Sequence, residues 1–231
     1  GGSTDAAMAA YGTIHAMVFP ILMFPAAALY AVSDLLVPEL SRSRAMGRRL
    51  RIVDLTDKCM RMGLLFAGAV AGTLLLCAEP LGELIYRSAD AARYLRIFAP
   101  MVLMLYLDAI VDGMLKGLAE QVSCVRYNTF TSLLDVLFLL VLLPRWGIGG
   151  YVFSFALTHA INLLLSLRRL LVTAQHRPKS VDFLRPIGST AAAVGMAALL
   201  PDGGTVGILL LRGGFFLAVL SACYLLTGAV T

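Results

Sequence analysis

Charge is scarce in this chain. Asp, Glu, Lys and Arg make up 14% of the 231 residues, against roughly 25% in ordinary soluble domains. Hydrophobic residues make up 59%, and the mean hydropathy is +0.84. A soluble domain of this size could not hide so much apolar surface. The composition therefore excludes an ordinary soluble protein and predicts one whose solvent is lipid.

Motifs for catalysis and metal binding are also missing. The four cysteines (Cys59, Cys77, Cys124 and Cys223) form no CxxC pair and have no histidines at metal spacing, which argues against a zinc site or a disulfide framework. We find no nucleophile elbow, P-loop, HExxH motif or dinucleotide fingerprint. We therefore expect no enzyme, no metal site and no cofactor. The net charge of +5 gathers at the ends of apolar segments, so no nucleic-acid partner is expected.

The beginning of the chain lacks an initiator Met and the charged n-region of a cleavable signal peptide. We therefore expect a fragment, a trimmed chain or a processed product.

Seven apolar segments are predicted to cross the membrane as helices. They are Thr13–Val37, Met62–Ala78, Ile97–Leu115, Tyr127–Leu143, Trp146–Leu167, Ile187–Leu200 and Val206–Thr227. The predicted fold is all-α and integral to the membrane, a polytopic bundle of about seven transmembrane helices.

Basic residues mark one side of the membrane. Most Lys and Arg residues follow the first, third and fifth segments, above all in Ser41–Arg61, which is also partly amphipathic. The positive-inside rule places this side in the cytoplasm, with the N-terminus outside and the C-terminus cytoplasmic. An external N-terminus without a signal sequence predicts at least one preceding helix.

Asp135 is the one acid in the apolar stretch 127–143. A carboxylate at mid-depth costs on the order of 3 kcal/mol to insert, so such groups usually face a polar pathway or a partner. One interpretation is a coupling-ion site for a proton or sodium. The other is a neutral acid hydrogen-bonded to a neighbouring helix.

Asp108, Asp112 and Lys116 recur every fourth residue and therefore share one helical face. As a functional site they would line a cavity in which Asp108 binds a proton, a sodium ion or a sugar hydroxyl. As a structural feature, Asp112 would pair with Lys116 and Asp108 would bond a neighbouring helix.

His159 and Asn162 are spaced to share another face, and a buried histidine can relay protons. His15 is a similar candidate. The structural alternative for each is an interhelical hydrogen bond. Pro20 and Pro25 interrupt the first segment, where each removes a backbone hydrogen bond. They predict either a hinge or a static kink.

Several short motifs together carry a resemblance to a known superfamily. They are Tyr-Gly-Thr-Ile-His-Ala-Met-Val-Phe-Pro from residue 11, Leu-Val-Pro-Glu-Leu-Ser at 36–41, Ala-Glu-Pro-Leu-Gly-Glu-Leu-Ile-Tyr at 78–86, Tyr-Leu-Arg-Ile-Phe-Ala-Pro at 94–100, Met-Leu-Lys-Gly-Leu-Ala at 114–119 and Leu-Pro-Arg-Trp-Gly-Ile-Gly-Gly at 143–150. Over roughly residues 8–175 the chain resembles the MOP/MATE-like flippases, nearest to the polysaccharide and stage V sporulation protein B-like branch.

The resemblance implies that this chain corresponds to helices eight to fourteen of a fourteen-helix parent. Residues 1–175 would form the helical bundle of the C-terminal lobe, including the basic cytoplasmic segment 41–61, and residues 176–231 would add two helices. The other half of the cavity would come from a missing N-terminal half or from a second copy.

The chain departs from the lipid II branch in one span and from the wider family at one position. That branch carries an arginine in the span matching residues 11–25, where this chain has only His15. Many relatives carry glutamine where Lys116 stands. The lipid II substrate is therefore not transferred to this chain.

The function expected from this resemblance is the flipping of a lipid-linked oligosaccharide or related polysaccharide precursor across the cytoplasmic membrane by alternating access. Its partners would be membrane lipid and that substrate. Two alternatives stay open, a multidrug or cation exporter of the same superfamily and a non-transporting scaffold in envelope assembly.

Overall fold

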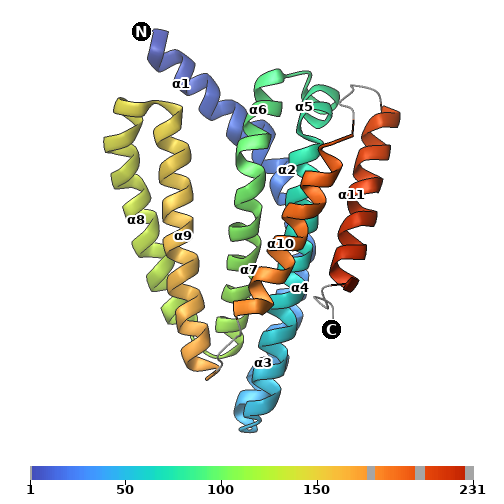
Figure 1. The fold of residues 1–231 in the computed structure, drawn as a ribbon. Helices are drawn as coiled ribbons and strands as arrows, with labels where there is room; N and C mark the ends of the chain where they lie inside the picture. The colour runs from blue at the N-terminus through green and yellow to red at the C-terminus, as the bar shows by residue number, and fades with distance from the viewer. Residues whose placement is uncertain (1, 176–179, 201–205, 227–231) are drawn as a thin grey trace. The chain divides into compact units, whose positions relative to one another are not determined.

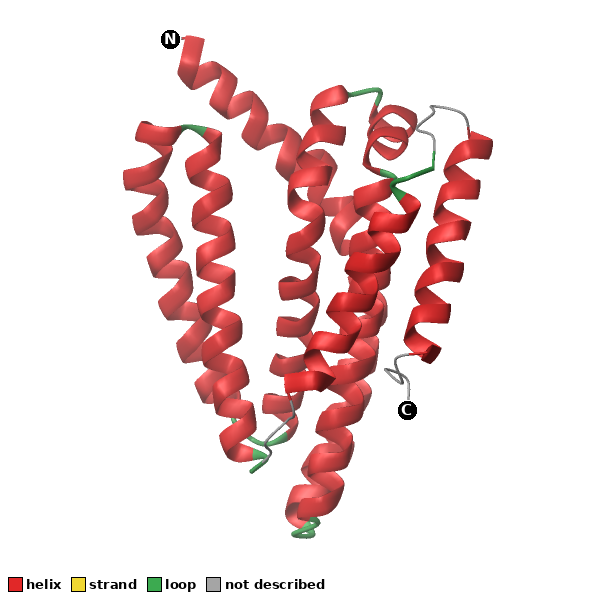
Figure 2. Ribbon diagram, in the orientation of Figure 1, coloured by secondary structure: helices red, strands yellow, loops and turns green. Residues whose placement is uncertain are grey.

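The computed structural model describes residues 2–175, 180–200 and 206–226. Within these ranges the chain is helical and contains no strand, and the loops between helices are short (Figure 2). This confirms the predicted all-α membrane bundle. Arg177, Lys179 and Thr227, which belong to the predicted basic cluster and the last predicted span, lie outside the described residues.

The first part of the chain forms six helical elements, and Figure 1 labels the α-helices among them. They are α1 (Gly2–Thr13), the π-helix η1 (Ile14–Val18), α2 (Phe19–Met23), α3 (Ala26–Ala45), α4 (Arg49–Leu76) and α5 (Ala78–Tyr86). The second part contains α6 (Ala89–Phe98), the 3-10 helix η2 (Ala99–Met101), α7 (Val102–Gly117), α8 (Gln121–Trp146), α9 (Ile148–Thr173), α10 (Ser180–Ala197) and α11 (Val206–Leu226).

Four helical stretches in the described residues are long and apolar enough to cross a membrane. They are Arg49–Leu76, Ala89–Gly117, Gln121–Trp146 and Ile148–Thr173, and the bent pair Met8–Met23 with Ala26–Ala45 makes a fifth if it counts as one span. The predicted number of seven is therefore not confirmed. The sixth and seventh predicted segments correspond to α10 and to α11, whose apolar part Leu210–Leu226 is shorter than the other spans.

The predicted first span is broken. The backbone widens into a π-helix over Ile14–Val18, just before Pro20, because proline has no N–H to donate and its ring crowds the preceding turn. Around Pro25 the helix stops, and the chain bends by 54° before α3 begins. Both prolines thus stand where the backbone ladder is interrupted, while their role as a hinge stays a prediction.

The basic segment Ser41–Arg61 is not a separate surface element. Its beginning completes α3, Gly47 turns the chain with a φ of 66°, and its second half is the start of α4, which continues to Leu76. The predicted span began at Met62, later than α4 itself, because the first turns of α4 are charged and give no hydrophobic signal. It also missed α5, whose nine residues are too short for a span.

The chain forms two compact units, each built from several stretches. The first contains Gly1–Tyr11, Ala26–Met60 and Met104–Arg177, and the second contains Gly12–Pro25, Arg61–Leu103 and Pro178–Thr231. In the first unit α8 and α9 form an antiparallel hairpin and lie side by side (Figure 1).

In the first unit α3 and α7 pack through small residues. Ser33 donates a hydrogen bond from Oγ to the carbonyl of Ala109 at 3.3 Å, and Ser41 does the same to the carbonyl of Gly117 at 2.9 Å. A Cβ on Gly117 would collide with the backbone of Val37 and with Leu40. The close approach of the two helices therefore depends on the absence of a side chain at this glycine.

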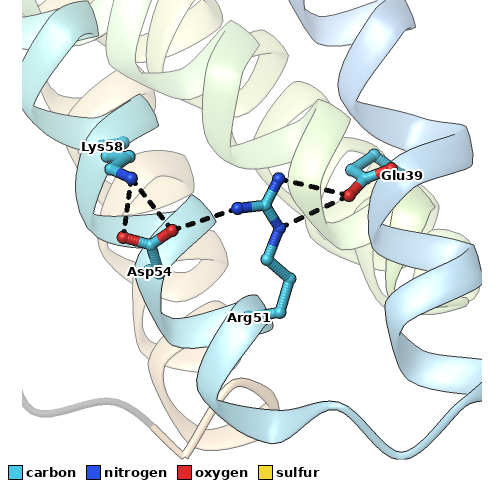
Figure 3. A network of polar contacts seen from close by, with 4 residues as sticks. All are labelled: Glu39, Arg51, Asp54 and Lys58. Atoms are coloured by element: carbon cyan, nitrogen blue, oxygen red, sulfur yellow. Dashed lines mark hydrogen bonds and ion pairs between the residues drawn. The ribbon is translucent and has the colours of Figure 1, made fainter.

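The start of α4 is tied to α3 by charge. Arg51 bonds Glu39 at 3.4 Å and Asp54 at 3.4 Å, and Lys58 also reaches Asp54 at 2.9 Å (Figure 3). These side chains are 41% to 63% exposed, so each pair contributes at most about 1 kcal/mol.

A further pair joins the α7–α8 connection to the last turns of α9. Arg169 donates from Nε and Nη2 to both carboxylate oxygens of Glu120, at 2.9 to 3.0 Å. Ser123 donates to the same carboxylate at 2.8 Å. The hydrogen bond from Ser123, with the neighbouring guanidinium of Arg169, holds the pKa of Glu120 below its usual value.

In the second unit the later part of α4 packs against α10 and α11. Phe216 is fully buried and lies over Gly72, which has room for no side chain. The hydroxyl of Tyr224 lies 2.9 Å from Thr190 Oγ1 and donates to the carbonyl of Leu65 at 3.3 Å. The last two helices are therefore integral parts of this unit.

Gly117→Val should destabilise the protein by about 1–3 kcal/mol, because the new side chain overpacks the contact between α3 and α7. The measurement is thermal unfolding in detergent. Gly149→Val is the matched control, since a Cβ at Gly149 meets nothing within 4 Å. Equal losses in the two variants would contradict the packing argument.

Glu120→Gln should lower the melting temperature at pH 7 but have little effect in acid. A lowered folded-state pKa means that the carboxylate stabilises the fold fully above its unfolded pKa of about 4.3, and that this contribution is lost as the pH falls through the folded pKa. Melting curves of both proteins between pH 7 and pH 3 test this. A difference that stays constant with pH would contradict it.

Candidate functional site

Helix α9 presents a buried polar face. Ser154, Thr158, Asn162 and Ser166 are spaced by four residues and are at most 4% exposed. Four residues advance a helix by about 6 Å and rotate it by about 40°, so the side chains form a slightly slanting row. A polar row buried in a span needs partners on the neighbouring helices.

Helices α7 and α8 supply those partners. Asp108 and Asp112 come from α7, and Asn128, Thr131 and Asp135 come from α8. We call these five residues, together with the four on α9, the polar cluster. All nine belong to the first unit.

One end of the polar cluster is formed around Asp135. Ser154 donates from Oγ to Asp135 Oδ1 at 2.6 Å, and Thr158 Oγ1 lies 3.4 Å from the same oxygen. Thr158 also donates to the carbonyl of Ser154 at 2.9 Å. The acid at mid-span is thus met by hydroxyl groups of α9.

The centre of the polar cluster is Asn162. Its Nδ2 donates to Asp108 Oδ2 and to Asn128 Oδ1, both at 2.9 Å. Its Oδ1 accepts from Thr131 Oγ1 at 3.4 Å. One side-chain amide thereby joins α7, α8 and α9.

Asp112 lies at the next turn of α7 and has neutral partners. Asn128 donates to it from Nδ2 at 3.2 Å, and Ser166 Oγ lies 3.5 Å from its other oxygen. The structural alternative in which Asp112 pairs with Lys116 is not what the fold shows. Lys116 is exposed and makes no ion pair with the described residues.

One carboxylate oxygen of Asp108 differs from the other acid oxygens of the polar cluster. Its Oδ1 is buried and has no hydrogen-bond partner in the described part of the chain. A buried carboxylate oxygen without a donor is costly unless the group takes up a proton or a cation. This oxygen is therefore the place in the polar cluster where a positive charge would be best accommodated.

The remaining candidates lie outside the polar cluster. His159 packs against Phe155, with ring centroids 4.2 Å apart and ring planes tilted by 53°, and it is not among the hydrogen-bond partners of Asn162. His15 is an exposed residue of the second unit and lies edge-on to Phe19 at 4.8 Å. No group of three or more His, Cys, Asp or Glu side chains in the described ranges is placed to hold a metal ion.

Sequence reasoning missed five members of the polar cluster, namely Asn128, Thr131, Ser154, Thr158 and Ser166. The regular four-residue spacing of polar residues on α9 was a usable signal, because an amphipathic stripe inside an apolar helix marks a buried interface. Hydroxyl groups carry no charge and therefore do not stand out in an apolar segment.

Asn162→Leu should destabilise the protein by about 1–3 kcal/mol, because it leaves the acceptors on Asp108 and Asn128 without their donor. Ser166→Ala is the matched control on the same helical face and should have a smaller effect, since its bond is long. Thermal unfolding in detergent measures both. A loss from Ser166→Ala as large as that from Asn162→Leu would contradict the central place of Asn162.

Comparison with known proteins supports the resemblance seen in the motifs. No family model matches the chain. Stage V sporulation protein B of Bacillus subtilis (strain 168) is 27% identical over 153 residues, which are 65% of this chain and 29% of that protein. The chain thus spans less than a third of the length of this relative. The similarity confirms the resemblance to the sporulation protein B-like branch and, with the apolar helices, indicates a flippase-like membrane protein.

Proposed function

We propose that this chain is part of a flippase that moves a lipid-linked oligosaccharide or related polysaccharide precursor across the cytoplasmic membrane. The headgroup would pass through a polar cavity by alternating access while the tail stays in lipid. A cation gradient, of protons or sodium ions, would drive the movement through the polar cluster. The observation that carries the proposal is the buried, unpartnered Oδ1 of Asp108.

The charge of the polar cluster supports this role. Asp108, Asp112 and Asp135 are three acids in membrane-spanning helices, and their hydrogen-bond partners are amides and hydroxyls. Three ionised carboxylates so arranged would need positive charge from outside the cluster. Ionisable groups inside spans are expensive and generally belong to ion or substrate pathways.

The arrangement also explains how ion binding would move helices. A cation on Asp108 would draw on oxygens from α7, α8 and α9, because Asn162 links the three. Binding can shift a conformational equilibrium only when the ligand prefers one state. A cation held by oxygens of all three helices would favour the conformation in which those oxygens converge.

The broken helix α2–α3 would supply the bending element. In transporters, interrupted helices flex as the cavity opens to alternate sides. Pro20 and Pro25 stand at the π-helix and at the 54° bend, and we assign them the hinge role. A role of His15, His159 and Lys116 in the pathway stays a prediction.

Three basic segments lie at one end of the first unit, which supports the proposed orientation. Ser41 bonds Gly117, Glu120 bonds Arg169, and a cleft joins Arg49 to Arg168. These contacts bring together the ends of α3, α7 and α9 and the start of α4. The positive-inside rule would place this end in the cytoplasm.

A second candidate is export of a cationic small molecule. It is favoured by the same acids, because a cluster of carboxylates without basic partners suits a positively charged substrate. Competition for transport between a lipid-linked saccharide and an organic cation, in vesicles holding the full-length protein, separates the two functions.

Asp108→Asn and Asp135→Asn should each abolish gradient-dependent transport in vesicles while leaving insertion and assembly intact. Asn keeps the size of Asp but cannot bind a proton or neutralise a cation. Asp90→Asn is the matched control, since Asp90 is an exposed acid in the first turn of α6. Imposing a sodium or a proton gradient separately identifies the ion.

Full transport by both cluster variants would overturn the coupling proposal. Normal envelope assembly after all three acids of the polar cluster are neutralised would instead favour a non-transporting scaffold.

A further inference from the structure

A second site lies away from the polar cluster, at the basic end of the first unit. A cleft of about 590 Å³ separates the first turn of α4 from the last turns of α9. Its main lining residues are Arg49, Leu164, Leu167, Arg168, Leu171 and Val172. The volume falls in the usual range of sites for small ligands, about 300–1,000 Å³.

The wall formed by α9 is apolar and open. Leu164 is 65% exposed and Val172 is 63% exposed. Leu164, Leu167 and Leu171 follow one another at helical spacing, so they form a continuous strip along the helix. Such a strip in a membrane protein is suited to an aliphatic chain.

Two guanidinium groups stand beside this strip. Arg49 and Arg168 form no ion pair with any described residue, although their sequence neighbours do. Arg51 is matched by Glu39 and Asp54 (Figure 3), and Arg169 is matched by Glu120. Two positive charges without an ion-pair partner among the described residues therefore line the cleft.

The start of α4 adds to that charge. A helix N-terminus carries a partial positive charge and is stabilised by acids, yet the first turn of α4 has no acid and begins with Arg49. This arrangement is unfavourable by itself. An anion bound beside the guanidinium of Arg49 would relieve it.

We propose that this cleft binds an anionic phospholipid of the surrounding membrane. Its phosphate lies between Arg49 and Arg168, and one acyl chain lies along Leu164, Leu167 and Leu171. Arginine suits a phosphate because its planar group donates two parallel hydrogen bonds. The apolar strip next to the charges selects a lipid over a soluble phosphate.

The bound lipid acts as a bridge between α4 and α9. It is a resident lipid rather than the transported one, and no residue of the polar cluster lines the cleft. The inference is therefore independent of the transport function, and the binding experiment below contains no transport step.

The experiment titrates the purified full-length protein with phosphatidylglycerol in a non-ionic detergent, using native mass spectrometry to count bound lipids. Phosphatidylcholine is the neutral-headgroup comparison and should bind more weakly. Arg49→Gln/Arg168→Gln should weaken phosphatidylglycerol binding by about tenfold or more, since each basic residue near the surface contributes to anionic-lipid binding.

Two controls isolate the site. Arg42→Gln/Arg126→Gln removes the same charge from exposed arginines outside the cleft and should change binding less than about twofold. Leu164→Asn should weaken phosphatidylglycerol but not glycerol phosphate, because only the lipid uses the apolar strip.

Three results would overturn the proposal. Equal weakening by the two arginine pairs would mean diffuse attraction to the basic end. Equal binding of phosphatidylcholine would mean that the headgroup charge is not recognised. Glycerol phosphate bound as tightly as the lipid would assign the cleft to a soluble phosphate.

Discussion

The side chain of Asn162 is the interaction on which the first unit depends. Backbone groups of membrane-spanning helices are satisfied within each helix, so the contacts between helices must come from side chains. Asn162 uses both donors and its acceptor on Asp108, Asn128 and Thr131. Through it the register of α7, α8 and α9 is fixed, and the positions of Asp108 and Asp112 follow.

The three acids of the polar cluster and Asn162 could be predicted from the sequence, but the other five members and the contacts between them could not. Asp108, Asp112 and Asp135 stand out because each is an acid in an apolar segment. Which residues meet them depends on the rotation and register of neighbouring helices, and a single sequence does not contain that information. His159 is an example. The sequence placed it on the same face as Asn162, but three residues along a helix leave a rotation of about 60° between the two side chains.

Some helix boundaries could be predicted from the sequence and others could not. Hydropathy located the middle of α8 and of α9, where apolar residues dominate, but it predicted α8 to begin at Tyr127 instead of Gln121 and α9 to end at Leu167 instead of Thr173. It placed the start of α4 too late, because the first turns contain Arg49 and Arg51, and it did not separate α2 from α3. A proline inside an apolar segment indicates an interruption, but whether the helix kinks or stops is decided by the packing around Pro25.

The acids of the polar cluster and the arginines of the cleft lie apart, so the two proposed sites would bind ligands of opposite charge. Lys116 is eight residues from Asp108, about 12 Å along α7, and no arginine forms an ion pair with Asp108, Asp112 or Asp135 in the described part of the chain. The acids therefore receive no permanent neutralising partner from the basic end. A coupling site must bind and release its ion reversibly. A guanidinium bonded to Asp108 would instead neutralise the carboxylate permanently and hold the protein in one conformation. In the proposed orientation, the arginines of the cleft would meet the headgroup region of the membrane, where negative charge is abundant.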